Sequence, residues 1–227
     1  MHGYLAVNMV SEKIYITHGY WAVGVVNERE IFSRAFDSVC HNKLFCKIRT
    51  LGIEGNLLSW IISFPSNRTI RTLVGSALSN SCPLRSGVVQ GSCIGPLLFV
   101  LYVNGVEEIF SNSTTTKLFA DDLKLYTELE SIGSNAILQK ELDLLSSWCI
   151  KWQLTISIKK CYIFNVGNLS KMHQKDVFIN AVCLPLVNTV KDLGILIDSQ
   201  LKIDLHINSI VAKAHASACL IFRFFCI

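Results

Sequence analysis

The sequence predicts an α+β domain built on an antiparallel sheet with helices on one face, and three observations support this. Hydrophobic residues make up 51% of the 227 residues and charged residues only 17%, which excludes a chain too polar to bury a core. Leu138, Leu142, Leu145, Cys149 and Trp152 recur at the spacing of an amphipathic helix. The stretch Lys117–Tyr126 places two acids between apolar flanks, a pattern typical of a β-hairpin with the acids at its tip.

The elements before this hairpin follow from local signals. Periodic apolar residues predict two helices joined by a short turn, because Gly52 and Pro65 supply the stops. Pro96 is expected to open a third helix, since proline is favoured in a first helical turn. The predicted ranges are helix 41–51, helix 55–64, strand 69–74 and helix 96–110.

The elements after the hairpin are less regular, apart from the helix that contains Leu138 and Trp152. Short apolar runs predict strands, and the spacing of Ile210, Val211, Ala214 and Ala218 predicts that the tail is helical. The predicted ranges are strand 154–157, strand 161–166, strand 192–197 and helix 206–225.

Composition narrows the setting of the protein. No apolar stretch approaches the roughly 20 residues that cross a bilayer, and no secretory signal is recognisable, so we expect no membrane partner and an intracellular protein, nuclear or cytoplasmic and not secreted. Nine cysteines without a C-x-x-C pair are expected to be buried reduced thiols. The net charge of +4 is spread among scattered basic residues, which permits nucleic-acid binding without arguing for it.

The adjacent acids Asp121 and Asp122 have two interpretations. Two neighbouring carboxylates are often a solvated turn. Their mutual repulsion would be relieved by a bound divalent cation, and hard oxygen ligands suit Mg²⁺ or Mn²⁺.

The motifs around these acids favour the second interpretation. In chain order they are Phe32-Ser33-Arg34-Ala35-Phe36-Asp37, Ser86-Gly87-Val88-Val89-Gln90-Gly91-Ser92 with Gly95-Pro96, Phe119-Ala120-Asp121-Asp122, Lys160-Cys161 and Lys191-Asp192-Leu193-Gly194. This ordered set closely resembles the reverse transcriptase domain of non-LTR (LINE-type) retrotransposons, from about residue 31 to the C-terminus.

The resemblance implies a right-hand polymerase palm with partial fingers and the start of a thumb. We expect a poorly assigned remnant of the fingers in residues 1–25, palm and fingers in residues 26–200, and a helical start of the thumb or connection in residues 201–227. The implied activity is RNA-directed DNA polymerisation, with an RNA template, a DNA primer and deoxynucleoside triphosphates as partners.

The resemblance also implies site residues. Asp121 and Asp122 would bind catalytic Mg²⁺ or Mn²⁺, two ions if the protein is active. Phe36 would stack under the incoming sugar, although an ordinary core aromatic is the alternative. Gln90, Gly91 and Ser92 would contact nucleotide and template, where they would otherwise be a plain loop. Lys160 would protonate the leaving pyrophosphate, or would be a solvated lysine.

One position departs from the family pattern in a way that affects catalysis. The family has Leu-Asp-Phe-Ser, whose acid is a third metal ligand, where this chain has Glu30-Ile31-Phe32-Ser33. An aliphatic side chain cannot bind Mg²⁺, and Glu30 is one residue out of register along a strand. Asp37 and His41 are expected to cap and orient the helix that follows them.

Three hypotheses follow from the sequence. The domain is an RNA-directed DNA polymerase by ancestry, catalytically impaired by Ile31; or it is a remnant that binds nucleic acid without polymerising; or it is an unrelated metal-dependent α/β enzyme. The third hypothesis predicts that Phe36 and Gln90 lie far from Asp121.

Overall fold

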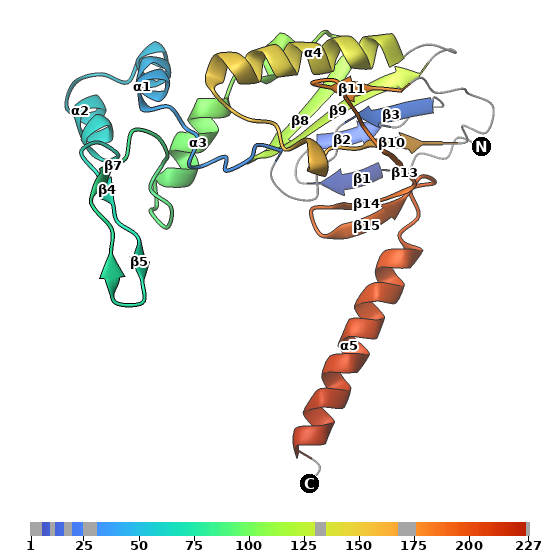
Figure 1. Ribbon diagram of the computed structural model, residues 1–227. Coiled ribbons are helices and arrows are strands. Elements are labelled where there is room, and N and C mark those ends of the chain that lie inside the picture. Colours follow the sequence, from blue (N-terminus) through green and yellow to red (C-terminus); the bar gives the residue numbers. More distant parts are fainter. Residues whose placement is uncertain are drawn as a thin grey trace.

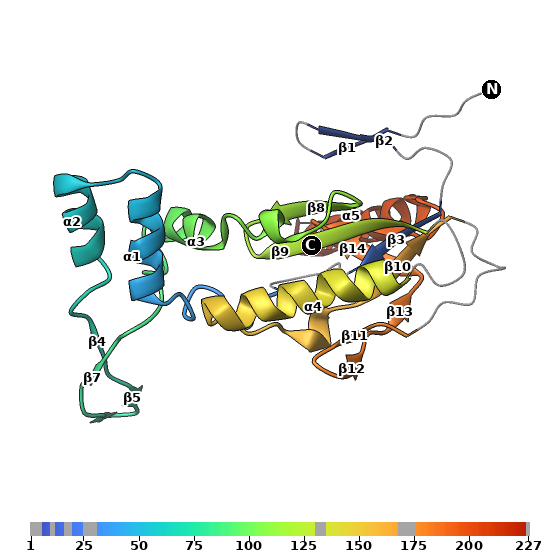
Figure 2. The same cartoon turned by 90° about the horizontal axis from the view of Figure 1, so that it is seen from above.

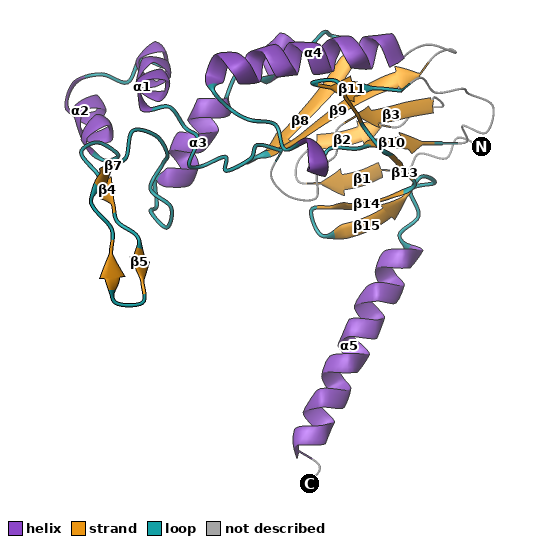
Figure 3. Cartoon of the chain, in the orientation of Figure 1, coloured by secondary structure: helices purple, strands orange, loops and turns teal. Residues whose placement is uncertain are grey.

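The computed structural model describes residues 6–9, 12–15, 20–24, 31–129, 135–167 and 176–225. The helices are α1 (His41–Thr50), α2 (Gly55–Ser63), α3 (Gly95–Val103), α4 (Asn135–Trp152) and α5 (Asp204–Phe225), with short 3-10 turns η1 (Glu107–Ile109) and η2 (Ile158–Lys160). The strands are β1 (Ala6–Met9), β2 (Glu12–Tyr15), β3 (Tyr20–Gly24), β4 (Thr69–Ile70), β5 (Leu73–Val74), β6 (Ala77–Leu78), β7 (Cys82–Pro83), β8 (Thr114–Phe119), β9 (Asp122–Leu129), β10 (Ile163–Val166), β11 (Phe178–Ile179), β12 (Val182–Cys183), β13 (Leu186–Val187), β14 (Thr189–Asp192) and β15 (Ile195–Asp198). Helices and strands occur in separate groups along the chain, as is typical of an α+β domain (Figure 3).

The main sheet has five strands in the order β13-β10-β3-β9-β8. Its pairings are antiparallel except for β10 with β13, which is parallel, so the expectation of a purely antiparallel sheet is wrong at that edge. The edge strand β13 follows the short β11–β12 hairpin, and this connection returns the chain in the same direction as β10. The central strand β3 comes from residues 20–24, so this sheet includes the end of the segment expected to be a fingers remnant.

The two faces of the sheet are covered by different elements. On one face Leu123 and Leu125 of β9 are fully buried in the same cluster as Leu138, Leu142 and Leu145 of α4. Side chains alternate along a strand, so Tyr126 points to the other face, where it joins Val190 and Ile197 of the β14–β15 hairpin in a second cluster. Figures 1 and 2 show α4 lying along one side of the sheet and β14–β15 on the other. The helix therefore covers one face, as the sequence predicts.

The predicted helices 41–51 and 55–64 are confirmed as α1 and α2, each one residue shorter, and the helix predicted from the spacing of Leu138 to Trp152 is confirmed as α4. The helix predicted for 96–110 begins at Gly95 and ends early, at Val103, because Asn104 leaves the helical conformation and Gly105 has φ +86°. The predicted strand 69–74 is divided into β4 and β5, which pair with β7 and β6 in a long exposed arm. The predicted strand 192–197 is a hairpin, since Leu193 and Gly194 both have positive φ. The predicted strand 154–157 is reduced to an isolated bridge of Ile156 with Phe32.

The C-terminal helix α5 is confirmed but projects away from the other elements (Figure 1). None of its residues is buried, and in length and apolar composition it could cross a membrane. The expectation that no stretch of the chain reaches this size is therefore wrong. Length and composition alone are weak grounds for a span, because core helices of globular proteins reach the same values.

A buried ion pair joins the sheet to the β14–β15 hairpin. Lys124 Nζ bonds to Asp192 Oδ1, with side-chain exposures of 5% and 13%. Burial, with the nearby charge of Asp192, raises the pKa of Tyr126 on the same face of β9. Lys117 stands directly opposite Lys124 across β8 and β9, and like charges in that position repel. The carboxylate of Asp192 therefore neutralises positive charge at the place where the sheet brings Lys117 and Lys124 together.

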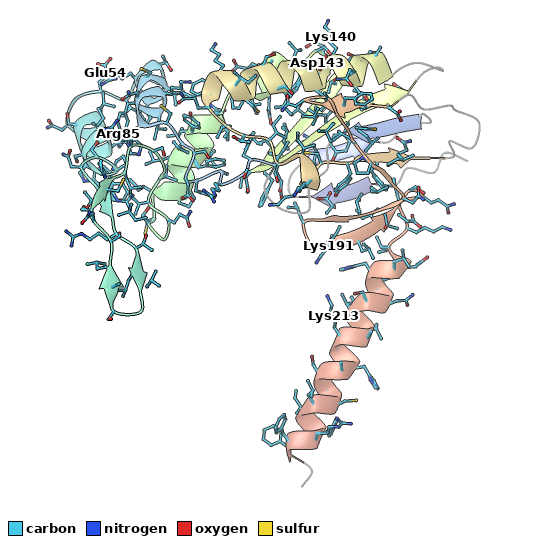
Figure 4. The ribbon with its side chains drawn as sticks, in the orientation of Figure 1. Glu54, Arg85, Lys140, Asp143, Lys191 and Lys213 are labelled. Carbon is cyan, nitrogen blue, oxygen red and sulfur yellow. The ribbon has the colours of Figure 1, made fainter. Side chains whose placement is uncertain are left out.

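We predict that either Lys124→Met or Asp192→Leu alone lowers the free energy of unfolding by about 3–5 kcal/mol, because each leaves a buried charge without its partner. The double variant Lys124→Met with Asp192→Leu should lie much closer to the parent protein. Urea unfolding of the four proteins measures the coupling, and Lys140→Met on the outer side of α4 is the control for losing an exposed lysine (Figure 4). Additive losses in the double variant would show that the two groups do not interact.

The cysteines divide into two environments. Cys149 and Cys161 are buried, and Cys40 is partly buried. The other described cysteines are exposed: Cys46, Cys82, Cys93, Cys183 and Cys219. The expectation that the thiols are buried is therefore wrong for these five. The eight described cysteines are free thiols. Burial raises the pKa of Cys149 to about 12, with a smaller contribution from Cys161, and burial likewise raises the pKa of Cys161 to about 12.

Because the thiolate is the reactive form, we predict that Cys149 and Cys161 resist iodoacetamide in the native protein at pH 8.5, while Cys46 and Cys82 are alkylated. Raising the pH by one unit should accelerate the exposed thiols and leave the buried pair unmodified, since their pKa lies well above both values. Mass spectrometry of peptides from native and urea-unfolded samples checks this. Equal labelling of all four thiols in the native protein would contradict the burial.

Candidate active site

The acidic pair lies at the tip of the β8–β9 hairpin, as the sequence predicts. Phe119 and Asp122 form the last cross-strand pair, so Ala120 and Asp121 make a two-residue turn. Ala120 has φ +53°, a value that tight hairpin turns need and that glycine adopts most easily. Asp121 and Asp122 are partly exposed, and oxygen Oδ2 of Asp121 is buried.

Ile31 lies directly beside this tip. Its N–H donates to the carbonyl oxygen of Asp121 at 3.1 Å, and its own carbonyl accepts from the N–H of Ser157 at 2.7 Å. Its side chain is fully buried in the main core cluster. Ile31, at the position where the resemblance leads us to expect a third acid, is thus hydrogen-bonded to the hairpin that carries Asp121 and Asp122.

Lys160 belongs to the segment on the other side of Ile31. It ends the turn η2, whose first hydrogen bond runs from the Lys160 N–H to the Ser157 carbonyl at 2.9 Å. Ser157 is the residue bonded to Ile31, so the backbone connects Asp121, Ile31 and the Lys160 turn in two steps. The Lys160 side chain is partly exposed.

Phe36 and the glycine-rich segment form the neighbouring part of the site. The N–H of Val88 donates to the carbonyl of Phe36 at 2.9 Å, and the Phe36 ring packs on Phe99 of α3 with 4.7 Å between centroids. Phe36 is only partly buried, so it contacts the core on one side and is accessible on the other. Gln90 is exposed and lies beside it, because its side-chain amide donates to Asp37 at 2.9 Å.

Gly91 and Ser92 have different local roles. Gly91 is exposed with φ +79°, which glycine adopts without strain, and nothing lies within 4 Å of where a Cβ would be. The Ser92 hydroxyl donates to the Val89 carbonyl at 2.6 Å and accepts the N–H of Gly95, the first residue of α3, at 3.0 Å. Ser92 therefore caps the start of α3, a use of its side chain that the sequence does not reveal.

The two parts of the site are connected by a short stretch of chain. Ile31 and Phe36 are five residues apart, so their Cα atoms are at most about 18 Å apart, and turns between them shorten this span. The chain between Ile31 and Phe36 thus links the acidic tip to the segment that bonds to Val88 and Gln90.

The donor set fits one divalent cation better than two. Within the described parts of the chain no group of three His, Cys, Asp or Glu side chains is placed to hold a metal ion. Asp121 and Asp122 supply two neighbouring carboxylates, which suffice for Mg²⁺ when substrate oxygens and water complete its shell. A second ion would need a further acid, and the adjacent residue at the tip is Ile31.

Two residues contribute to the site in a way that the sequence does not predict. Asp37 does not cap α1: Cys40 precedes that helix, and its N-terminus has no side-chain cap. His41 is buried and its Nε2 lies 2.8 Å from the carbonyl oxygen of Gly87. Both therefore hold the glycine-rich segment rather than the helix. Only their position in the Phe36 motif could have drawn attention to them.

An acidic hairpin tip beside an aromatic residue and a glycine-rich segment, on an α+β fold, is the arrangement of a nucleotide-transferring polymerase domain. Residues 32–197 match the family described as reverse transcriptase (RNA-dependent DNA polymerase). The chain therefore belongs to the reverse transcriptase family.

The curated relatives are proteins of mobile elements. The chain is 28% identical over 184 residues to the RNA-directed DNA polymerase from mobile element jockey of Drosophila funebris and 29% identical to that of Drosophila melanogaster; each match covers 78% of this chain and 20% of the relative. It is 28% identical over 192 residues to the probable RNA-directed DNA polymerase from transposon X-element of Drosophila melanogaster, covering 80% of this chain and 20% of the relative. The chain thus spans about a fifth of the length of these relatives.

We predict that Ala120→Gly stabilises the protein by about 1 kcal/mol, because glycine adopts positive φ without the clash that Ala120 carries. Gly87→Ala is the contrasting variant: φ is +89° and the new Cβ would lie 3.1 Å from the Asp37 Cα, so the free energy of unfolding should fall. Chemical unfolding measures both. A loss of stability in Ala120→Gly would show that the turn carries no strain.

Proposed function

We propose that this chain is the palm-centred part of an RNA-directed DNA polymerase whose catalysis is impaired at Ile31. The observation that carries the proposal is the hydrogen bond from Ile31 to the carbonyl of Asp121, because it sets a buried aliphatic side chain beside the acidic tip. The main sheet with α4 corresponds to the palm, the unit of α1, α2 and β4–β7 to part of the fingers, and α5 to the start of the thumb.

The residues of this site have complementary roles in nucleotidyl transfer. A divalent cation held by Asp121 and Asp122 would supply charge neutralisation at the reacting phosphate. Phe36 offers a ring face for the sugar of the incoming deoxynucleotide, and its bulk excludes a 2′-hydroxyl. Gln90 and Gly91 contact nucleotide and template, and the Lys160 ammonium is the proton donor for the leaving pyrophosphate.

The distribution of charge supports nucleic acid as the partner. Residues 41–85, which form α1, α2 and the β4–β7 arm, contain six of the 21 Lys and Arg residues and only one of the 17 acidic residues, Glu54. Figure 4 shows Glu54 and Arg85 in this unit, which stands apart from the main sheet. The unit is therefore positively charged mainly because it contains almost no acids, while most basic residues lie elsewhere in the chain. Such an excess of positive charge attracts the phosphates of a template and primer.

A second function, binding nucleic acid without polymerising, is favoured by the same position. Without a carboxylate at residue 31, only two acids would hold the cations that neutralise the triphosphate. The missing ligand would remove several kcal/mol of transition-state stabilisation, on the scale of single electrostatic groups in active sites (about 3–4 kcal/mol). The basic unit would keep its attraction for phosphates in such a protein.

We predict that the thermal stability of the Ile31→Asp variant depends on a divalent cation. In EDTA the new buried carboxylate should lower the melting temperature, because a charge without a partner is costly to bury. Mn²⁺ should raise the melting temperature again. At a concentration one hundred times its dissociation constant, it should add about 2.7 kcal/mol to the free energy of unfolding. Ile31→Asn has nearly the same shape without the charge and should not respond to Mn²⁺. Thermal unfolding in EDTA and in Mn²⁺ measures the difference.

Primer extension on a primed RNA template with Mg²⁺ or Mn²⁺ tests the activity itself. The parent chain should extend poorly, Ile31→Asp should extend faster, and Asp121→Ala in the Ile31→Asp background should extend nothing. Extension by the parent chain that disappears with Asp121→Ala would contradict the impairment. If the parent chain binds neither primed template nor Mn²⁺, the polymerase assignment itself is wrong.

A further inference from the structure

The glycine-rich segment is held against the Phe36 segment by four contacts. The N–H of Gly87 donates to the Val39 carbonyl at 2.8 Å, and the N–H of Val88 donates to the Phe36 carbonyl at 2.9 Å. The buried His41 ring contacts the Gly87 carbonyl, and the Gln90 amide donates to Asp37. Since a Cβ on Gly87 would lie 3.1 Å from the Asp37 Cα, the two segments are in close contact where Asp37 stands.

The bond between Asp37 and Gln90 has a defined polarity. A carboxylate accepts hydrogen bonds and donates none, so the group that Gln90 turns toward Asp37 must be its NH₂. The carbonyl oxygen Oε1 lies on the opposite branch of the same planar amide and therefore points away from Asp37. Both side chains are exposed, and the next residue, Gly91, has no side chain that could hold the amide from the other side. Asp37 thus decides which end of the Gln90 amide is presented.

We propose that Asp37 is a positioning residue: it orients the Gln90 amide so that Oε1 accepts a hydrogen bond from the bound nucleotide. The inference rests on the proposed nucleotide site. It adds that Gln90 acts there as the hydrogen-bond acceptor and the nucleotide as the donor. The matching group on the nucleotide is a donor, either a sugar hydroxyl or a base amino group. Without Asp37 the amide rotates and presents either end, so the nucleotide must order it on binding.

The test for the nucleotide compares three triphosphates in Mn²⁺: dATP, 2′,3′-dideoxy-ATP, which lacks the sugar hydroxyl, and 2′-deoxynebularine triphosphate, which lacks the base amino group. We expect one of the two analogues to bind the parent protein about three- to tenfold more weakly than dATP, the effect of losing one hydrogen bond. Asp37→Ala should bring that ratio close to one, as should Gln90→Ala. A residue that acts only through folding would weaken all three ligands equally.

Conservative replacement supplies the rescue. Asp37→Asn retains a carbonyl oxygen that can accept from the Gln90 NH₂, so this variant should keep most of the discrimination that Asp37→Ala loses. Asp143 is the matched control, because on α4 it accepts a hydrogen bond from the side-chain amide of Gln139 at 2.9 Å, the same pair of groups at the same distance. Figure 4 shows Asp143 on the outer side of that helix. Asp143→Ala should leave the nucleotide ratio unchanged.

A measurement without nucleotide keeps the two proposals separable. The side-chain amide signals of Gln90 in a ¹H–¹⁵N spectrum should move toward solvent-like values in Asp37→Ala and stay near the parent positions in Asp37→Asn. The signals of Gln139 should not respond to Asp37→Ala, because that amide is held by Asp143 and by the backbone of Phe178. An unchanged Gln90 signal in Asp37→Ala overturns the inference, and so does equal binding of all three nucleotides by the parent protein. If no nucleotide binds while the Gln90 signal does respond to Asp37, the failure lies with the proposed function.

Discussion

The hydrogen bonds of Ile31 are the constraint on which the arrangement of the site depends. A single residue connects the acidic hairpin tip through its N–H and the Lys160 turn through its carbonyl, and its side chain is part of the main core. Because the backbone makes these contacts, they persist whatever the side chain is. The backbone of Ile31 therefore holds the hairpin tip and the Lys160 turn together, while its side chain packs in the core. The effect of this aliphatic side chain on cation binding is part of the proposed function.

Charge is segregated across the fold in three places. Two carboxylates stand at the hairpin tip, and Lys124, two residues along the same face of β9, is neutralised by Asp192 from β14. Asp192 thus keeps a buried ammonium paired close to the acidic tip. The basic unit of α1, α2 and the β4–β7 arm lies away from the tip, where positive charge can attract a nucleic acid without competing for the carboxylates (Figure 1).

The glycine-rich segment combines structural and functional roles residue by residue. Gly87 allows close contact with Asp37, the Ser92 hydroxyl caps α3, and a Cβ on Gly95 would lie 2.5 Å from the Val89 carbonyl. These residues keep the segment in place, and Gln90 and Gly91 remain at its exposed turn. Most residues of this glycine-rich segment therefore fix its backbone, and only Gln90 and Gly91 are exposed at its turn.

Local patterns in the sequence were sufficient for α1, α2, α4 and the acidic hairpin, because helical and strand periodicity is written within ten to twenty residues and depends little on distant neighbours. The ordered motifs were likewise sufficient for the family, and the apolar flanks were sufficient to place Asp121 and Asp122 at a hairpin tip. The tertiary structure alone decided that Ile31 contacts Asp121, that Asp37 holds Gln90 rather than a helix end, and that Lys124 pairs with Asp192, residues separated by 90, 53 and 68 positions. Each of these contacts depends on how the sheet packs against the hairpins and helices around it, and no local periodicity encodes which distant segments that packing brings together.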